Sequence, residues 1–337
     1  MTEPGEFADR SVQRSWVRRV GIAGALLGIL AVCAAVPSGC HPGPASYALR
    51  LIPASEAAVA CGWLHRRYRR RVADARAVSD AVQGVLLRPL PSRIGGLALA
   101  SVYRASGGQA RVGGDLYAVA RADAATRVII GDVRGRGLPS FLDVIAVLGA
   151  FREWAPQARS LTELSTRLEE SFLRHLADAH DDADERFVTA LILEVPDSES
   201  PARMVNYGHP PLVRARPGEV ALLPGHPCPP LGLSSLCDVR AHESVFELGP
   251  DDTLLLYTDG LIEARDCSGV CFPLLERAAT WTWNDRLRCS QDCLRGVLGQ
   301  ILDDIVAHCG ALPADDLALI ALARQGERGR AALPRRS

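Results

Sequence analysis

The residues best suited to chemistry in this sequence are aspartates that stand next to glycines at the ends of predicted β-strands. Asp115 opens an alternating segment, and Asp132 lies near the end of the β-rich run 127–133. The turn-like stretch 122–126 separates the two segments, which predicts a β-hairpin. Antiparallel pairing about this turn places Asp115 opposite or close to Asp132. Facing carboxylates repel each other unless a cation neutralises them, so the pair indicates a cation site.

A second pair of strand ends carries acidic residues in the C-terminal part of the chain. The apolar segment 253–257 leads to Asp259, and the apolar segment 317–323 begins just after Asp315 and Asp316. If these two strands pair antiparallel, Asp259 and Asp315 lie at the same end of a sheet. Turn or capping roles would explain one acidic pair on its own, and the second pair weakens that explanation.

The aspartates and their neighbouring glycines make a ligand set that suits a hard divalent cation. Four acidic positions at strand ends supply the all-oxygen environment that Mg²⁺ or Mn²⁺ prefers. Gly114 and Gly260, beside Asp115 and Asp259, have no side chain, so that backbone and metal can approach closely. Two ions about 3.5–4 Å apart can share a carboxylate and activate a water for attack on phosphorus. The site therefore predicts phosphoester hydrolysis.

The composition excludes several other classes of protein. The chain is 48% hydrophobic with a net charge of −1, which argues against a disordered protein and against a whole-chain basic field for nucleic acid. All 38 cationic residues are arginine. A Schiff-base enzyme, a Walker-type nucleotide site and a protein kinase each need a lysine, so these mechanisms are excluded. Ten scattered cysteines indicate a reducing compartment rather than a disulfide scaffold.

The N-terminal part of the chain is predicted to anchor it in a membrane, through a segment at 20–64. The uncharged stretch 20–36 would span about 26 Å as a helix, against a hydrocarbon core of roughly 30 Å. Arginines occupy several positions of residues 1–19, and others at 66–71 follow a second, mostly apolar stretch, 51–64. Because arginine clusters mark the cytoplasmic side, we expect two crossings and a cytoplasmic C-terminal domain at the cell membrane.

Other arrangements of this segment stay open. Arg50, Pro53 and Glu56 lie in or beside the second stretch, which is compatible with a single span or with a helix lying in the membrane interface. A secretory signal is a further alternative, because residues 38–40 resemble a lipoprotein cleavage site.

The rest of the chain divides into three parts. Residues 65–89 are predicted to form a linker helix, residues 90–324 a globular domain, and residues 325–337 a disordered basic tail. Within the domain, a capping box at Ser160 and Glu163 predicts the start of an amphipathic helix. Its apolar face comprises Leu161, Leu164, Leu168, Phe172 and Leu176, and a second helix of this kind is expected over 292–309, with Leu294, Leu298, Ile301, Leu302 and Ile305.

Six segments, in this order over residues 90–324, resemble the metal-dependent protein serine/threonine phosphatases (PPM, protein phosphatase 2C-like). They are GGDLY, IGDVRGRG, FVTALILEV, VNYGHPPLV, LLLYTDGLIEARD and DDLALIAL. The SpoIIE-like branch is the most similar, in the membrane-anchored form common in actinobacteria. The resemblance implies an α+β fold with two packed antiparallel β-sheets flanked by α-helices, a four-layer αββα arrangement, preceded by an N-terminal membrane segment.

The resemblance also implies the roles of individual residues. A pair of Mn²⁺ or Mg²⁺ ions is expected, with Asp132 bridging both. The implied ligands are four carboxylates and one backbone carbonyl: Asp115, Asp132, Asp259, Asp315 and the carbonyl of Val133. Asp316 is expected to support these ligands rather than to bind metal.

Two residues near the expected ligands have open roles. His209 matches a family motif, and it is either a catalytic acid or base or a loop histidine that hydrogen-bonds the backbone. Some phosphatases of the wider superfamily have a histidine proton donor soon after the bridging aspartate, whereas Arg134 follows Val133 in this chain. The acid for the leaving group is therefore unassigned. Arg134 and Arg136 could attract phosphate or be solvated on the surface.

Four cysteines form an unusual pattern of two pairs, each with three residues between: Cys267, Cys271, Cys289 and Cys293. The spacing lies within the range of structural zinc sites, and single thiols are the common alternative.

The functional expectation is a membrane-associated, cytoplasm-facing protein phosphatase. By resemblance, its partner is a phosphorylated anti-anti-sigma factor, dephosphorylated in a partner-switching pathway. We expect no nucleic-acid partner, and a homodimer stays open. The alternatives are a non-catalytic regulator that keeps the fold and a phosphohydrolase that acts on small molecules.

Overall fold

The computed structural model describes a defined set of residues: 62–63, 65–67, 84, 86–105, 113–135, 137–178, 186–198, 201–234, 241–283, 291–311, 313 and 315–324. The chain divides into two compact units, Met1–Ala75 and Arg76–Ser337. The predicted span 20–36, most of the stretch 51–64 and the tail 325–337 lie outside the described residues. In the part of the chain that is described, no helix is both long enough and apolar enough to cross a membrane.

The second unit contains two antiparallel β-sheets, as the resemblance implies. The six-stranded sheet has the order β1 (Arg93–Ile94), β2 (Leu97–Arg104), β11 (Leu317–Arg324), β10 (Thr253–Tyr257), β7 (Leu212–Arg216) and β8 (Glu219–Leu223). The five-stranded sheet has the order β3 (Asp115–Ala122), β4 (Ala125–Val133), β5 (Val188–Pro196), β6 (Ala202–Tyr207) and β9 (Ser244–Phe246).

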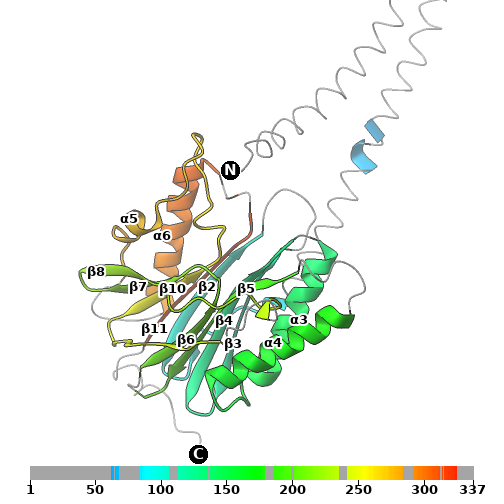
Figure 1. Cartoon of the computed structure of the whole chain (residues 1–337). Helices are drawn as coiled ribbons and strands as arrows, with labels where there is room; N and C mark the ends of the chain where they lie inside the picture. The colour runs from blue at the N-terminus through cyan, green and yellow to red at the C-terminus, as the bar shows by residue number, and fades with distance from the viewer. Residues whose placement is uncertain are drawn as a thin grey trace, which may run out of the picture. The chain divides into compact units, whose positions relative to one another are not determined.

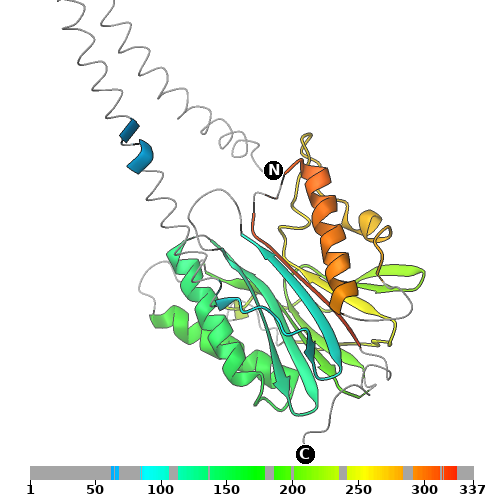
Figure 2. The same ribbon diagram turned by 180° about the vertical axis from the view of Figure 1, so that it is seen from behind.

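Helices cover the outer face of each sheet. The helices are α3 (Leu138–Trp154), α4 (Leu161–Asp178), α5 (Leu274–Ala278) and α6 (Gln291–Cys309). Figures 1 and 2 show α3 and α4 on the five-stranded sheet, and α5 and α6 on the six-stranded sheet. The predicted α+β architecture of two sheets with flanking helices is therefore confirmed.

Strand β11 shows how the apolar residues divide between the layers. Its residues 317–323 are all buried, because one face of the strand meets the other sheet and the opposite face meets helices. Successive side chains of a strand point to opposite faces. Ala318, Ile320 and Leu322 accordingly join the core between the sheets, whereas Leu317, Leu319, Ala321 and Ala323 join the core beneath α6.

Helix α4 confirms the capping and burial that its sequence predicts. The Ser160 hydroxyl oxygen accepts the N–H of Glu163 at 3.1 Å. The Glu163 carboxylate accepts the N–H of Arg159 at 2.8 Å, one residue before the expected position. All five predicted apolar residues of the helix are buried. Helix α6 likewise buries most of its predicted face, with Val297 added and Leu302 only partly buried.

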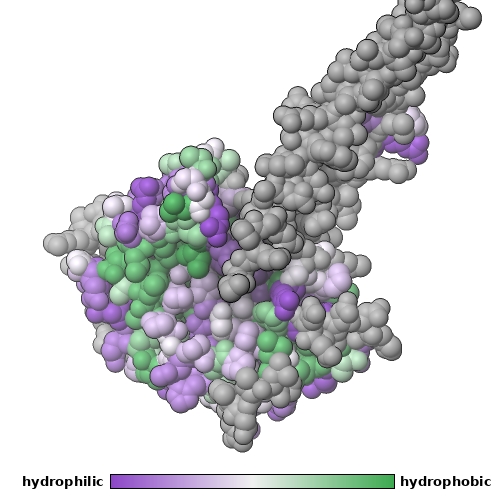
Figure 3. Space-filling view, turned by 45° about the horizontal axis from the view of Figure 1, so that its top comes forward, coloured by the Kyte–Doolittle hydropathy of each residue, from purple (hydrophilic) through white to green (hydrophobic). Residues whose placement is uncertain are grey.

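Helix α3 is apolar on most of its circumference. Its inner face is buried in the core, and its outer face exposes Leu142 and Ile145. Such a helix lacks the polar stripe by which a period of 3.6 residues is recognised. On the face of the molecule shown in Figure 3, hydrophobic and hydrophilic residues of the second unit lie side by side.

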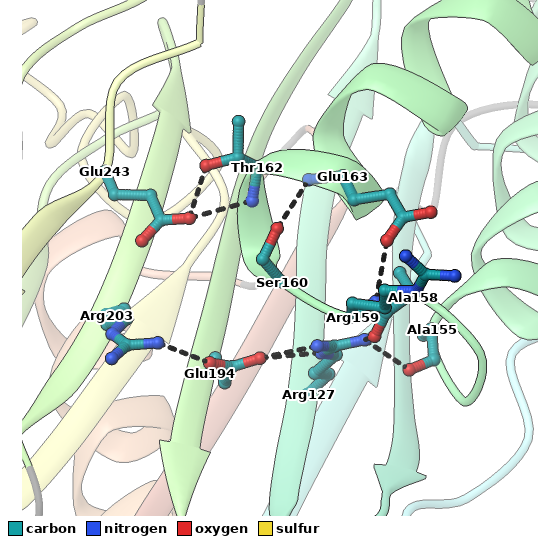
Figure 4. A network of polar contacts seen from close by, with 10 residues as sticks. All are labelled: Arg127, Ala155, Ala158, Arg159, Ser160, Thr162, Glu163, Glu194, Arg203 and Glu243. Atoms are coloured by element: carbon teal, nitrogen blue, oxygen red, sulfur yellow. Dashed lines mark hydrogen bonds and ion pairs between the residues drawn. The ribbon is translucent and has the colours of Figure 1, made fainter.

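A buried arginine fixes the junction of α3 and α4 to the five-stranded sheet. Arg127 on β4 donates from Nε to Glu194 Oε2 at 2.8 Å, and from Nη1 to the carbonyls of Ala155 and Ala158, each at 2.8 Å. Arg203, whose side chain is 46% exposed, approaches the other oxygen of Glu194 at 3.5 Å. Figure 4 shows this network between the strands and the start of α4. The arginine thus satisfies the carbonyl of Ala155, at the C-terminal cap of α3, and that of Ala158, in the connection to α4.

Replacing the buried arginine should strongly destabilise the domain. We expect Arg127→Met to lower the free energy of unfolding by about 3–5 kcal/mol, because Glu194 and two carbonyls lose a buried donor. Arg203→Met, which removes the exposed partner of the same carboxylate, should cost less than about 1 kcal/mol. Urea unfolding of both variants measures the difference, and equal losses would contradict the role of Arg127.

Candidate metal centre

The predicted hairpin brings the first two aspartates together. Strands β3 and β4 pair antiparallel with Asp115 directly opposite Asp132, which confirms the expected register. On the other side of β4, Asp132 pairs with Thr189 of β5. Among the described strands, β4 is the only sheet neighbour of β3, the strand that begins with Asp115.

The second acidic pair also lies at one end of its sheet, as predicted. Strands β10 and β11 pair antiparallel, with Tyr257 opposite Leu319. The chain continues from Tyr257 to Asp259 and reaches β11 from Asp315 and Asp316, so the acidic residues share this end.

Three carboxylates meet between the two sheets. Ligand oxygens of Asp115, Asp132 and Asp259 all lie within 4.8 Å of one another. Two of the three come from the five-stranded sheet and one from the end of β10 in the six-stranded sheet. In the described part of the chain, no other group of three or more histidine, cysteine, aspartate or glutamate side chains gathers in this way. We call Asp115, Asp132 and Asp259 the acidic triad.

Two glycines allow the backbone to pack closely around the triad. A Cβ added at Gly114 would lie 2.6 Å from Oδ1 of Asp132 and 2.8 Å from the carbonyl oxygen of Val133. A Cβ added at Gly260 would overlap the carbonyl oxygen of Asp316. Either side chain would therefore displace a group beside the triad, which explains why glycine flanks both Asp115 and Asp259.

Burial and mutual repulsion make the triad costly to ionise. Burial raises the pKa of Asp115 well above its ordinary value, and the charge of Asp132 raises it further. Burial raises the pKa of Asp132 to about 7, with contributions from Asp259, Asp315 and Asp316. The pKa of Asp259 is also raised, first by burial and then by Glu263. A bound cation would offset this repulsion, because its positive charge attracts each of the carboxylates.

The donor set of the triad suits a hard divalent cation. Carboxylate oxygens from three chain segments converge, and the repulsion that raises the pKa values of Asp115 and Asp132 favours the binding of a positive ion. The acidic triad could therefore bind a metal ion. The carbonyl of Val133 lies beside Gly114, next to this cluster, and its role as a ligand stays a prediction.

The other two acidic residues lie near the triad but are not part of it. Asp315 is exposed and Asp316 is half-buried. Both are close enough to raise the pKa of Asp132. The side chain of Asp316 packs against Gly113, just before Gly114. Metal binding by Asp315 and support by Asp316 stay predictions.

His209 has the contacts of a structural loop histidine. Its Nε2 lies 3.1 Å from the carbonyl oxygen of Tyr257, and its Nδ1 lies 3.3 Å from the hydroxyl of Thr189. Since a carbonyl only accepts, Nε2 carries the proton, and Nδ1 of the neutral ring is an acceptor. The single proton of the Thr189 hydroxyl has two acceptors in reach, Nδ1 and the carbonyl of Asp132 at 3.4 Å. Burial lowers the pKa of His209 to about 3, so the ring is neutral near pH 7. These contacts favour the loop interpretation over catalysis.

Arg134 lies beyond the end of β4. Its N–H donates to the carbonyl of Phe187 at 3.0 Å, and its guanidinium lies 5.2 Å from the centre of the Phe187 ring. The side chain is exposed. Arg136 lies outside the described residues. The acid for the leaving group stays unassigned, because an arginine and not a histidine follows Val133.

The predicted cysteine cluster is only partly described. Cys267 and Cys271 are exposed and Cys293 is half-buried, and none of these three forms a disulfide. Cys289 lies outside the described residues.

Thr258 is a residue of the site that the sequence reasoning missed. Its hydroxyl donates to Oδ2 of Asp115 at 2.8 Å and accepts the N–H of Ala318 at 2.9 Å. Its position directly before Asp259 was the available signal, but spacing along the chain does not show a contact with the other sheet.

Comparison with known proteins identifies related sequences and folds. The family model described as Stage II sporulation protein E (SpoIIE) matches residues 122–325, which is more than half of the chain. The match contains Asp132, Asp259, Asp315 and Asp316 and begins after Asp115. No curated protein matches the sequence.

Three solved structures share the fold at low sequence identity. The SiaA-PP2C domain of Pseudomonas aeruginosa has a TM-score of 0.61 and 16% identity, over 77% of this chain and 99% of that one. The PP2C phosphatase domain with a regulatory fragment of SpoIIE from Bacillus subtilis has a TM-score of 0.55 and 14% identity, over 68% and 64%. The RsbU and RsbW domains of Rv1364c from Mycobacterium tuberculosis have a TM-score of 0.53 and 18% identity, over 70% and 61%. The chain thus spans less than two thirds of the last two.

The raised pKa of Asp132 predicts how pH affects the metal-free protein. The folded state keeps this proton up to about pH 7, whereas the unfolded chain loses it near pH 4. The stability that this proton contributes is therefore complete below about pH 4 and is lost as the pH rises to about 7. In chelator, Asp132→Asn should raise the free energy of unfolding by about 1–4 kcal/mol at pH 8, and change it little at pH 4.

Urea unfolding at the two pH values measures this effect. Asp303→Asn, which alters an exposed carboxylate on α6, is the matched control and should change neither value. A loss of stability in Asp132→Asn that is equal at both pH values would contradict the electrostatic origin.

Proposed function

The chain belongs to the SpoIIE family and carries a PP2C-like serine/threonine protein phosphatase domain, and from this premise we propose a specific function. The protein removes phosphate from phosphoserine or phosphothreonine on a partner protein, with two divalent cations, Mn²⁺ or Mg²⁺. The observation that carries the proposal is the acidic triad, in which ligand oxygens from both sheets lie within 4.8 Å of one another.

The roles of the chain's own groups follow from their positions. When bound, the cations would supply Lewis acidity and a water acidic enough to act as a nucleophile near neutral pH. Asp115, Asp132 and Asp259 would hold them. The Val133 carbonyl and Asp315 join the ligand set by resemblance. Asp115 is buried and Asp132 and Asp259 are half-buried, so access of bulk water to these carboxylates is limited, which strengthens their attraction for a cation.

We propose a phosphorylated anti-anti-sigma factor as the partner, in a partner-switching pathway. Membership of the SpoIIE family supports this substrate class. The pairing of RsbU and RsbW domains in the Mycobacterium tuberculosis relative is in keeping with it. Arg134, exposed beyond the end of β4, is a candidate contact for the phosphate or for acidic groups of the partner.

We also propose that the segment 20–64 anchors the protein at the cell membrane with the phosphatase domain in the cytoplasm. The support is the uncharged stretch 20–36 between two arginine-rich segments. In this arrangement the enzyme would act on partners near the membrane surface.

Phosphate release tests the enzymatic proposal. The full-length chain should hydrolyse a phosphoserine protein in Mn²⁺ or Mg²⁺ and lose this activity in chelator. Asp132→Asn should lower turnover by several orders of magnitude while the domain stays folded, because the group proposed to bridge the ions is changed. Asp303→Asn should keep the wild-type rate, since its carboxylate is exposed on α6.

The substrate panel separates the alternatives. A phosphorylated anti-anti-sigma factor, para-nitrophenyl phosphate and nucleotides are compared under the same conditions, and the phosphoprotein should give the highest kcat/KM. Preference for a nucleotide would indicate a small-molecule phosphohydrolase. A folded, metal-loaded chain without activity on any of them would indicate a non-catalytic regulator.

The membrane proposal has an independent test. A reporter fused to the C-terminus should give a cytoplasmic signal, and the protein should sediment with membranes. Deletion of residues 20–64 should move the protein to the soluble fraction, because the proposed anchor is removed. An external signal from the fusion would overturn the proposed orientation.

A further inference from the structure

Thr258 connects the acidic triad to the backbone of the opposite sheet. It follows β10 directly and is fully buried. Its hydroxyl lies 2.8 Å from Oδ2 of Asp115, which belongs to the five-stranded sheet. The same oxygen lies 2.9 Å from the N–H of Ala318 on β11 in the six-stranded sheet. The backbone N–H of Thr258 also donates to the Ala318 carbonyl at 3.1 Å. One side chain therefore contacts both sheets at the metal centre.

The hydrogen-bond donors and acceptors fix the direction of this contact. The N–H of Ala318 can only donate, so the Thr258 oxygen must accept from it. The hydroxyl of Thr258 then donates its single proton to Oδ2 of Asp115, and this bond can be kept when the carboxylate ionises, because an ionised carboxylate only accepts. A hydrogen bond of this kind favours the charged form of the carboxylate, and it partly offsets the burial and repulsion that raise the pKa of Asp115.

Asp115 needs such a partner because of its place in the fold. It is the first residue of β3, and in the part of the chain that the structure describes β3 pairs with β4 alone. Pairing with β4 fixes its backbone opposite Asp132 but does not fix the rotation of its carboxylate. The hydrogen bond from Thr258 is made to Oδ2 of the Asp115 carboxylate and not to Oδ1. The carboxylate is thereby oriented before a cation arrives.

We propose that Thr258 is a positioning residue of the metal centre, which orients the Asp115 carboxylate for cation binding. The inference rests on the proposed function, since it concerns the affinity of the same site. The hydroxyl is the group that acts, and neither the size of the side chain nor the stability of β10 accounts for the effect.

Three substitutions separate the hydroxyl from packing. Thr258→Val keeps the shape and removes the hydroxyl, whereas Thr258→Ser keeps the hydroxyl. Thr253→Val is the matched control at the other end of β10, because Thr253 is also buried and its hydroxyl has no hydrogen-bond partner among the described residues. Thr258→Ala, which leaves room for a water beside Ala318, replaces Thr258→Val if that variant does not fold.

Calorimetric titration of the full-length, metal-free chain with Mn²⁺ is the primary measurement. We expect Thr258→Val to raise the Kd for Mn²⁺ by about 10–100-fold, the range seen when a group that orients a metal ligand is removed. Thr258→Ser and Thr253→Val should bind with a Kd close to that of the wild type. In phosphatase assays, Thr258→Val should require more Mn²⁺ for half-maximal activity and recover most of its kcat at saturating Mn²⁺.

The outcomes distinguish this inference from the proposed function. A wild-type chain that binds no Mn²⁺ overturns the proposed function and the inference with it. If the wild-type chain binds Mn²⁺ and Thr258→Val binds it with the same Kd, the inference alone is overturned. An equal loss of affinity in Thr258→Ser and Thr258→Val also overturns it, because the hydroxyl would then have no specific role.

Discussion

The repulsion between closely spaced carboxylates at the meeting point of two sheets is the constraint on which the site depends. Asp115 and Asp132 face each other across a hairpin, and Asp259 approaches them from the opposite sheet. Without a cation this arrangement opposes folding, as the raised pKa of each aspartate indicates. The packing of the sheets must offset it, and the continuous core between them, which includes Ile129 and Ile320, supplies that stabilisation.

Consecutive residues at the end of β10 join the two sheets in different ways. The carbonyl of Tyr257 accepts from the His209 ring, whose other nitrogen contacts Thr189 beside Asp132. The next residue, Thr258, bonds to the first aspartate of the triad, and the residue after it belongs to the triad. Polar contacts thus join the two sheets beside the triad. Buried polar contacts of this kind are directional, so they define one geometry.

Much of the fold could be predicted from local patterns, and the parts that were missed have physical reasons. The hairpin register followed from the turn at 122–126, and α4 from its capping box and apolar face. Helix α3 was not predicted, because it is apolar on most of its circumference and has no side-chain cap. In the site, strand ends indicated three of the carboxylates, but the contacts of Thr258 and His209 join segments far apart in the chain. Sequence spacing cannot show which atoms meet across two sheets.

The division of β11 between two cores limits how the acidic end of this strand can move. Each residue of 317–323 faces either the other sheet or α6, and the side chains on both faces are packed in a buried core. A slip of one residue would exchange the two sets, so the nearest alternative register differs by two residues, or about 7 Å. A step of that size would carry Asp315 and Asp316 away from Asp132. Their distance from the triad therefore cannot vary gradually through sliding of the strand, and any fine adjustment must come from rotation of side chains or from the loop before β11.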